Sequence, residues 1–332
     1  MADSLDGSRV LVTGGAGFIG SSFVRRLLEQ HPASHAVVLD ALTYAGRREN
    51  LDGLPARSLT FLHGDIRDPA AVAAAMDGCD FVLNFAAESH VDRSIEEPGE
   101  FIQTDVYGVF VLCEEARRQK VQRFIQVSTD EVYGSLGETG KFTEQSPIVP
   151  SSPYSASKAS ADLLALACHH TFGQDVIVTR CSNNYGPYQF PEKLIPLMII
   201  KALNDQLLPV YGDGKNVRDW IHVEDHCAAL VATLFKGKPG QTYNLGGDGE
   251  MVNLEVVRLI LDRLGKPHSL ISFVTDRLGH DRRYAIDSSL AKRELDWHPL
   301  HTAREGIAAT VDWYLNHRGW WQTLLERTER FD

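Results

Sequence analysis

Tyr154 and Lys158 are spaced so that they could act together on the proton of an alcohol. Ser152 and Pro153 have the form of a helix start, and residues four apart lie on one face of a helix. A tyrosine normally ionises near pH ~10, so a phenolate base at neutral pH needs positive charge beside it. The Lys158 ammonium would supply one such charge, and an oxidised nicotinamide ring another. Because the same spacing occurs on solvated helices, the interpretation depends on the rest of the chain.

A second group of reactive side chains follows an apolar run that begins at Phe124 and predicts a β-strand. These are Thr129, Asp130 and Glu131. Two neighbouring carboxyl groups in an enclosed site do not readily both ionise, so a shared negative charge is physically reasonable. The alternative for an Asp-Glu pair at the end of a strand is a solvated turn.

The N-terminal elements predict a dinucleotide site. A short buried strand at 9–13 leads into a glycine turn and then an amphipathic helix to about residue 30. Gly14, Gly17 and Gly20 follow the pattern G-x-x-G-x-x-G, not the usual G-x-G-x-x-G, and would let backbone N–H groups approach a pyrophosphate. Asp40 ends the next strand, where a carboxylate would bind a ribose diol and repel a 2′-phosphate. We therefore expect NAD, although a plain strand-turn-helix connection is the alternative.

The residues expected at the NAD site are Gly14, Gly17, Phe18, Ile19, Gly20, Asp40, Leu42, Thr43, Asp65, Ile66, Ala86, Ala87, Tyr154 and Lys158.

Strands and helices alternate along the first half of the chain. Strands are expected at 36–39, 59–66, 81–87, 124–128 and 176–180, and helices at 69–76 and 106–119. This alternation predicts an α/β fold with a Rossmann-type doubly wound parallel sheet, whose ligands bind at the carboxyl ends of the strands. Shorter, turn-rich elements follow. We therefore expect an NAD-binding domain at 1–180 and a smaller C-terminal substrate-binding domain at 181–332, from which some segments return to the first.

The composition is that of an ordinary globular protein, with 43% hydrophobic and 23% charged residues in 332. The net charge of −11 argues against a nucleic-acid or anionic-membrane surface. The first residues lack an apolar signal core and no segment approaches the ~20 apolar residues of a membrane span, so we expect a cytoplasmic protein. The five cysteines are scattered, which favours reduced packing residues over disulfides or metal ligands.

An acidic chain that binds an anionic substrate must gather cations locally. Arg218, Arg277, Arg282, Arg283 and Lys193 could do so, because arginine binds phosphate in a bidentate manner that suits a diphosphate. Taken alone, each arginine is more often a surface charge.

His222 and His226 are four apart and flank Glu224 and Asp225, a pattern that is similar to part of a zinc site. No third ligand is evident in the sequence, and the segment reads as helical. We therefore expect no metal.

Several long segments closely resemble the dTDP-glucose 4,6-dehydratases, which are extended short-chain dehydrogenases/reductases. The resemblance runs over nearly the whole chain, and its most specific parts are Thr129-Asp130-Glu131 ahead of Tyr154 and the segment 183–194. Related galactose epimerases share the Tyr and Lys but generally lack the Asp-Glu pair. The matching segments are 11–20, 86–94, 128–134, 152–158, 180–196, 210–219 and 276–287.

The resemblance implies an NAD-dependent hydro-lyase that converts dTDP-glucose to dTDP-4-keto-6-deoxyglucose and water, in deoxysugar biosynthesis, and that forms a homodimer. It implies that Tyr154 accepts the proton of the C4 hydroxyl beside the positive charge of Lys158, and that Thr129 hydrogen-bonds the C4 oxygen. It implies that Glu131 is the C5 base and that a protonated Asp130 donates to the C6 oxygen. The implied substrate residues are Ser89, Thr129, Asn183, Lys193, Leu194, Pro209, Tyr211, Arg218, Asn253, Arg277 and His280, with Pro209 and Tyr211 beside the thymine.

Two other classes of protein stay open. One is another NAD-dependent sugar-nucleotide enzyme: an epimerase, a decarboxylase or a UDP-sugar dehydratase. The other is a non-catalytic dinucleotide sensor on the same fold, in which the catalytic set is usually broken. In this chain Thr129, Tyr154 and Lys158 are all present.

Overall fold

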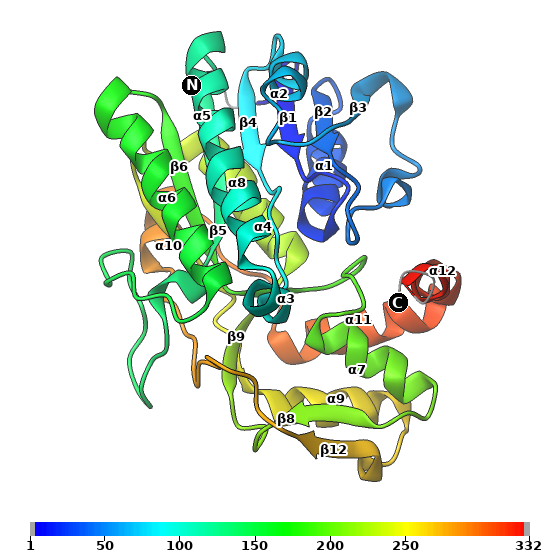
Figure 1. Ribbon diagram of the computed structural model, residues 1–332. Helices are drawn as coiled ribbons and strands as arrows, with labels where there is room; N and C mark the ends of the chain where they lie inside the picture. The colour runs from blue at the N-terminus through cyan, green and yellow to red at the C-terminus, as the bar shows by residue number, and fades with distance from the viewer. Residues whose placement is uncertain (1–3, 329–332) are drawn as a thin grey trace.

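A parallel sheet of seven strands forms the centre of the larger part of the molecule (Figure 1). The computed structural model describes residues 4–328. From edge to edge the strands are β10 (Thr242–Leu245), β6 (Val176–Cys181), β5 (Arg123–Thr129), β4 (Phe81–Asn84), β1 (Arg9–Thr13), β2 (His35–Asp40) and β3 (Leu59–His63). The order β3-β2-β1-β4-β5-β6, with β10 added at the β6 edge, is that of the doubly wound Rossmann folds and confirms the predicted fold class.

Helices cover both faces of this sheet, which is why its strands read as nearly continuous apolar runs. Val10 and Val12 of β1 pack into one hydrophobic cluster, and Leu11 between them packs into the other. The first cluster includes side chains of α1 (Phe18–Gln30), α8 (Val223–Lys236) and α10 (Ser289–Leu295). The second includes side chains of α2 (Pro69–Met76), α5 (Gly108–Gln119) and α6 (Pro153–Phe172).

A smaller part, the cap, lies below the carboxyl ends of these strands in Figure 1. It has its own core, in which Ile199, Trp220, Ile260 and Val311 are buried. Its strands are β7 (Asn183–Tyr185), β9 (Val217–His222) and β11 (Glu250–Val252) in one sheet and β8 (Leu208–Tyr211) and β12 (Ile271–Val274) in another. Its helices are α7 (Leu194–Leu203), α9 (Asn253–Leu264), α11 (Ala303–Asn316) and α12 (Arg318–Thr328).

Short helical turns connect these elements. They are η1 (Arg48–Leu51), η2 (Ala56–Ser58), α3 (Val91–Glu96), α4 (Pro98–Phe101), η3 (Ile102–Tyr107), η4 (Asp130–Tyr133) and η5 (His268–Leu270).

Several predicted bounds differ from the structure. The strands expected at 59–66 and 81–87 end at His63 and Asn84, because the residues after them line a cavity instead of continuing the ladder. The helix expected from 106 is preceded by α4 and by the π-helical turn η3, since Pro98 can begin a helix. His222 ends strand β9 and does not belong to a helix, contrary to expectation.

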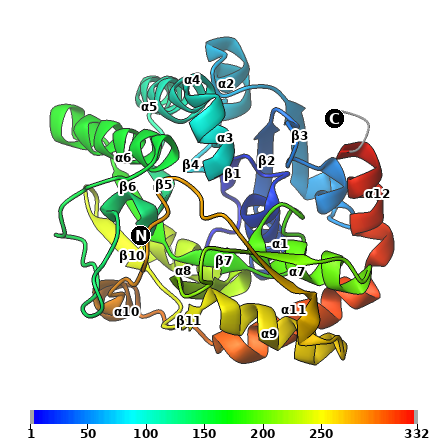
Figure 2. The ribbon, with the colours of Figure 1, turned by 60° about the horizontal axis from the view of Figure 1, so that its bottom comes forward.

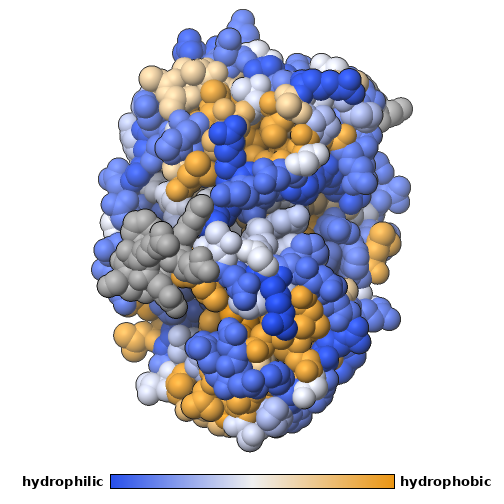
Figure 3. Space-filling view, turned by 90° about the vertical axis from the view of Figure 1, so that its right-hand side faces the viewer, coloured by the Kyte–Doolittle hydropathy of each residue, from blue (hydrophilic) through white to orange (hydrophobic). Residues whose placement is uncertain are grey.

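The surface is largely hydrophilic on the side shown in Figure 3, where hydrophobic side chains lie in separate patches above and below a mostly hydrophilic band. Within residues 4–328, no helix has the length and apolar character needed to cross a membrane. All five cysteines are buried with free thiols, as predicted.

Arg123, which begins β5, is the basis of a prediction on stability. Its guanidinium is buried, pairs with Asp175 at 3.0 Å, and donates to the carbonyls of Thr233 and Leu234 at 3.1 and 2.7 Å. Replacing it by methionine should lower the free energy of unfolding by about 2 to 4 kcal/mol, because three acceptors lose their donor. Chemical denaturation measures the loss.

The matched control is Arg118→Met, which breaks an exposed pair with Glu115 and should leave the denaturation midpoint unchanged. Equal midpoints for the two variants would contradict the role given to Arg123.

Candidate active site

A cavity of about 330 Å³ lies at the carboxyl ends of the sheet strands and extends from the glycine turn to Tyr154 and Lys158. Seen from this end, the segment 275–287, drawn in orange, crosses the face between the sheet and the cap (Figure 2). The cavity is therefore bounded by both parts of the molecule, as the Rossmann folds place their ligands.

The glycine turn packs so closely that side chains cannot replace its hydrogens. A Cβ at Gly14 would lie 2.7 Å from the Ala86 nitrogen, and one at Gly20 would lie 2.3 Å from the Gly14 oxygen. The helix α1 begins directly after Gly17, and no side chain caps its first N–H groups. These donors, at the positive end of a helix dipole, suit a pyrophosphate.

Asp40 lines the cavity at the end of β2 and also shapes the turn. Its carboxylate accepts N–H groups of Ala16 at 2.9 Å and Leu42 at 2.8 Å. Burial raises the pKa of Asp40, and these two hydrogen bonds oppose that shift. Of the residues expected at the NAD site, Leu42 alone is outside the cavity lining, because its side chain packs against the core beside β1.

Tyr154 and Lys158 project from the start of α6, which begins with a capping box between Ser152 and Ser155. The Lys158 ammonium donates to the Val127 carbonyl at 2.9 Å and so holds this turn against β5. Burial raises the pKa of Tyr154 well above its usual value, and the negative charge of Glu131 raises it further. A phenolate here therefore needs a second positive charge, as expected from the sequence.

The Asp130–Glu131 pair lies in η4, directly after β5, and is not a solvated turn. The Thr129 hydroxyl accepts the Glu131 N–H at 3.2 Å and so caps the turn. Burial and the neighbouring Glu131 carboxylate raise the pKa of Asp130 well above its usual range. Burial also raises the pKa of Glu131, while the charges of Arg277, Arg218 and Lys193 oppose that shift. The site thus favours a protonated Asp130 beside a Glu131 surrounded by cations.

Four predicted substrate residues line the cavity: Ser89, Thr129, Asn183 and Lys193. The Lys193 ammonium donates to the Ser89 carbonyl at 2.7 Å, across the join between sheet and cap. The others lie outside this lining, in the cap and in the 275–287 segment: Leu194, Pro209, Tyr211, Arg218, Asn253, Arg277 and His280.

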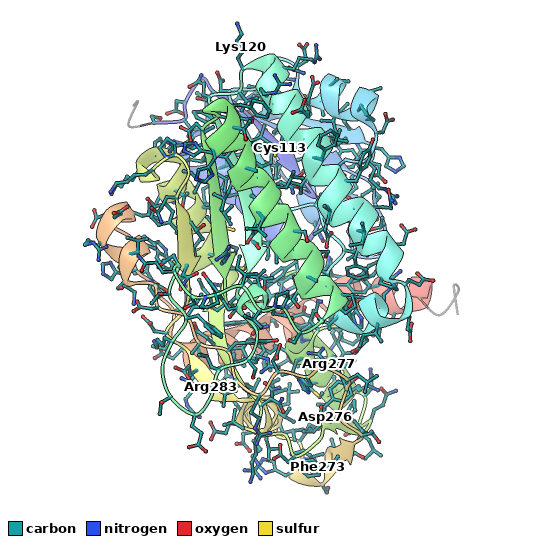
Figure 4. All side chains as sticks on the ribbon, turned by 60° about the vertical axis from the view of Figure 1, so that its left-hand side comes forward. Cys113, Lys120, Phe273, Asp276, Arg277 and Arg283 are labelled. Atoms are coloured by element: carbon teal, nitrogen blue, oxygen red, sulfur yellow. The ribbon has the colours of Figure 1, made fainter. Side chains whose placement is uncertain are left out.

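The arginines separate into two groups. Arg218 and Arg277 lie near Glu131, as their effect on its carboxyl group shows, and Arg277 lies below the lower end of α6 in Figure 4. Arg282 instead pairs with Asp213 at 2.7 Å and Arg283 with Glu250 at 2.8 Å, and Figure 4 shows Arg283 apart from Arg277. Arg282 and Arg283 are thus engaged in ion pairs with carboxylates of the protein, and their binding of a diphosphate stays a prediction.

The histidines are arranged differently from the predicted pair. The His226 ring bonds to the Asn184 amide at 2.9 Å, while His222 stacks on His301 with ring centroids 4.1 Å apart. His222, Glu224 and His301 could offer three metal ligands, so the structure brings together a third candidate ligand that the sequence did not reveal. Stacked rings direct their in-plane nitrogen lone pairs side by side rather than at one ion. The expectation of no metal stays a prediction.

Sequence reasoning missed several residues of the cavity. Gln189 and Glu192 line it, and their signal was their position inside the specific 183–194 segment. Asp105, which does not itself line the cavity, accepts the Ser157 hydroxyl of α6 at 2.6 Å. A single acidic residue in a helical segment carries no motif, so no sequence pattern indicated it.

The fold and the Tyr154–Lys158 pair beside a glycine turn define an extended short-chain dehydrogenase/reductase. The family model described as GDP-mannose 4,6 dehydratase matches residues 11–310. The dTDP-glucose 4,6-dehydratase of Xanthomonas campestris pv. campestris (strain B100) is 54% identical over 97% of both chains, and that of Streptomyces antibioticus is 51% identical over 96% of both. The chain belongs to the dTDP-glucose 4,6-dehydratase family.

Comparison with solved structures supports the same family. The Streptomyces venezuelae dTDP-glucose 4,6-dehydratase, crystallised with NAD and TYD, is similar with a TM-score of 0.92 and 50% identity over 95% of this chain and 99% of its own. The UDP-glucose 4-epimerase of Thermotoga maritima has a TM-score of 0.87 and only 28% identity over 93% of this chain and 99% of its own. The fold is shared with epimerases, whereas the sequence is much more similar to the dehydratases.

Gly20→Ala tests the glycine turn. The added methyl group must displace the Gly14 carbonyl or the helix, so the purified variant should carry far less NAD than the wild-type protein. NAD released by denaturation and measured per chain gives the result. Gly99→Ala is the control, because a Cβ there has nothing within 4 Å, and its NAD content should equal that of the wild type. Equal NAD content in Gly20→Ala would contradict the assigned site.

Proposed function

We propose that this protein converts dTDP-glucose to dTDP-4-keto-6-deoxyglucose and water, as an NAD-dependent hydro-lyase. The observation that carries the proposal is the pair of a buried Asp130 and a partly buried, cavity-lining Glu131 next to Tyr154. Oxidation at C4 needs only the Tyr and Lys, but removal of water across C5 and C6 also needs an acid and a base at the same time. The environment of the pair favours these two different protonation states.

Four side chains have separate roles in the proposed reaction. Tyr154 accepts the proton of the C4 hydroxyl while the Thr129 hydroxyl orients the C4 oxygen. Glu131 removes the proton at C5, made acidic by the C4 ketone, and Asp130 donates its proton to the departing C6 oxygen. Asp130 suits this role because one of its carboxyl oxygens is buried without a hydrogen-bond partner among residues 4–328. Asp130 is 1% exposed and is not among the lining residues of the cavity, although its neighbours Thr129 and Glu131 are. An unpaired buried oxygen is rare in a folded protein, and a substrate oxygen would satisfy it.

The cavity residues fit NAD. The glycine turn and the first N–H groups of α1 would hold the pyrophosphate, and Asp40 the adenosine ribose. When bound, NAD would supply the hydride chemistry needed at C4 and C6. No net oxidant is consumed, so we expect the purified protein to carry NAD.

The sugar nucleotide would lie where the cavity meets the cap. The carboxamide oxygens of Asn183 and Asn253 are buried and have no hydrogen-bond partner within residues 4–328, which favours their use by a ligand. Arg218 and Arg277 suit the diphosphate. Tyr211, 42% exposed on β8, suits the thymine ring.

The epimerase, decarboxylase and sensor alternatives explain the structure less well. None of them needs a proton donor and a base at the end of β5, and burying two unused carboxyl groups would be costly. A UDP-sugar dehydratase would need the same pair. The identity of about half of all residues to dTDP-glucose enzymes favours thymine over uracil.

Turnover with labelled dTDP-glucose tests the proposal. Deuterium at C4 of the substrate should appear at C6 of a 4-keto-6-deoxy product within one molecule, and solvent deuterium should appear at C5. Mass spectrometry and NMR give both positions. Tyr154→Phe should lose turnover at least ~100-fold with little change in substrate affinity, because it removes a proton acceptor and no phosphate contact. Loss of the C4 label to water, or exchange between molecules, would contradict this mechanism.

We also propose that the protein is a cytoplasmic homodimer. Free buried cysteines suit a reducing compartment. The helices α5 and α6 lie side by side on the outside of the sheet in Figure 1 and carry exposed apolar side chains. On α6, Leu163 is 55% and Phe172 54% exposed, while Phe110 of α5 and Tyr107 at the end of η3 are nearly half exposed. A second copy that packs its own α5 and α6 here would bury these side chains.

The dimer is tested by Leu163→Asp, which places a charge in the centre of this helical face and should give monomers in sedimentation velocity. Leu300→Asp is the control, because Leu300 is 86% exposed outside α5 and α6 and should not change the mass. A wild-type monomer, or dimers that survive Leu163→Asp, would contradict the proposed interface.

A further inference from the structure

A buried carboxyl group that does not line the cavity is hydrogen-bonded to α6, the helix that carries Tyr154 and Lys158. Asp105 belongs to η3, the π-helical turn between α4 and α5, and is 1% exposed. π-Helical turns within α-helices are frequent at functional sites. Its neighbour Thr104 lines the cavity, so η3 presents one residue to the site and buries the next behind it.

Asp105 joins two walls of the cavity. One carboxyl oxygen accepts the Glu88 N–H at 2.9 Å, in the segment that follows β4. The other accepts the Ser157 hydroxyl at 2.6 Å, next to Lys158 on α6. The carboxyl group thus fixes the wall that includes Ala86 and Ala87 against the turn that carries Tyr154 and Lys158.

We propose that Asp105 is a positioning residue for the reaction, whose carboxylate controls how readily Tyr154 releases its proton and holds the first turn of α6 in place. The proposal rests on the function proposed above, because it takes Tyr154 as the base. Asp105 itself would touch neither substrate nor cofactor.

The charges around Asp105 support this role. The ionisable groups that face it are Lys158 and Tyr154 from α6 and Glu88 from the segment after β4. Burial raises the pKa of Asp105 to about 6, against the opposing effects of Lys158 and its two hydrogen bonds. Above that pH the carboxylate is charged, and its charge raises the pKa of Tyr154.

The Ser157 hydroxyl links the protonation state of Asp105 to the backbone carbonyl of Tyr154. It also lies 2.8 Å from the Tyr154 carbonyl, and its single proton can serve only one acceptor. A charged Asp105 accepts the hydrogen bond of the Ser157 hydroxyl. A neutral Asp105 donates a hydrogen bond to the Ser157 oxygen instead, and the Ser157 hydroxyl then donates to the Tyr154 carbonyl. Asparagine would mimic the neutral form, since its amide can donate to Ser157 and its oxygen can accept from Glu88.

The test is the pH profile of kcat/KM for the NAD-loaded enzyme. Asp105→Asn removes the charge but keeps both hydrogen bonds, so the acidic limb should move to lower pH by about one unit with a nearly unchanged plateau. Asp105→Ala should show the same shift and a roughly tenfold lower plateau kcat, because both anchors are lost. Asp312→Asn, at an exposed ion pair, is the control and should leave the profile unchanged.

An acidic limb that stays in place in both Asp105 variants overturns the proposal, even if kcat falls, because a purely structural role would have that result. A second measurement needs no turnover. The near-ultraviolet phenolate absorbance of NAD-loaded protein, minus that of Tyr154→Phe, reports the ionisation of Tyr154, and Asp105→Asn should shift it to lower pH. Wild-type protein that does not turn over dTDP-glucose would refute the proposed function, while this titration would still decide the role of Asp105.

Discussion

The enclosure of Asp130 and Glu131 at the end of β5, the first buried and the second partly buried, is the constraint on which the rest of the site depends. Removing two neighbouring carboxyl groups from water is costly unless one stays neutral or positive charge is supplied. Here both occur, since Asp130 favours its protonated form and Arg218, Arg277 and Lys193 surround Glu131. All three cations come from the cap or the 275–287 segment. The cap therefore stabilises the Asp130–Glu131 pair as well as bounding the cavity.

A buried network also supports the turn that carries the pair. The Tyr133 hydroxyl, in η4, donates to Asn244 at 2.8 Å and accepts from Arg180 at 2.9 Å, while Arg180 pairs with Asp162 of α6. Asn244 lies on β10, which returns from the cap region to become the edge strand of the main sheet. This return links the catalytic turn to α6 and to a distant segment.

Much of the fold and of the catalytic end could be predicted, because local patterns carry them. The apolar runs and the glycine turn predicted the sheet and its ligand edge, and the specific segment around Asn183 and Lys193 indicated two residues that line the cavity. Packing partners decided the rest. Arg282 and Arg218 are the same residue type in the same region, and only Asp213 beside Arg282 makes it a surface ion pair. The contact of His301 with His222 is a tertiary contact without a sequence signal.

The helix α12 near the C-terminus is linked to the glycine turn through Asn50. The Trp320 indole of α12 donates to Asn50 at 3.1 Å, and the buried Asn50 amide donates to the Ala16 carbonyl of the glycine turn at 3.0 Å. Trp320 also packs against Tyr188, which lies in the loop between β7 and α7. The glycine turn is therefore held by residues from both ends of the chain, and opening it would break buried hydrogen bonds. Such rigidity would obstruct an enzyme that exchanges its cofactor at each turnover, but it suits one that regenerates NAD in place.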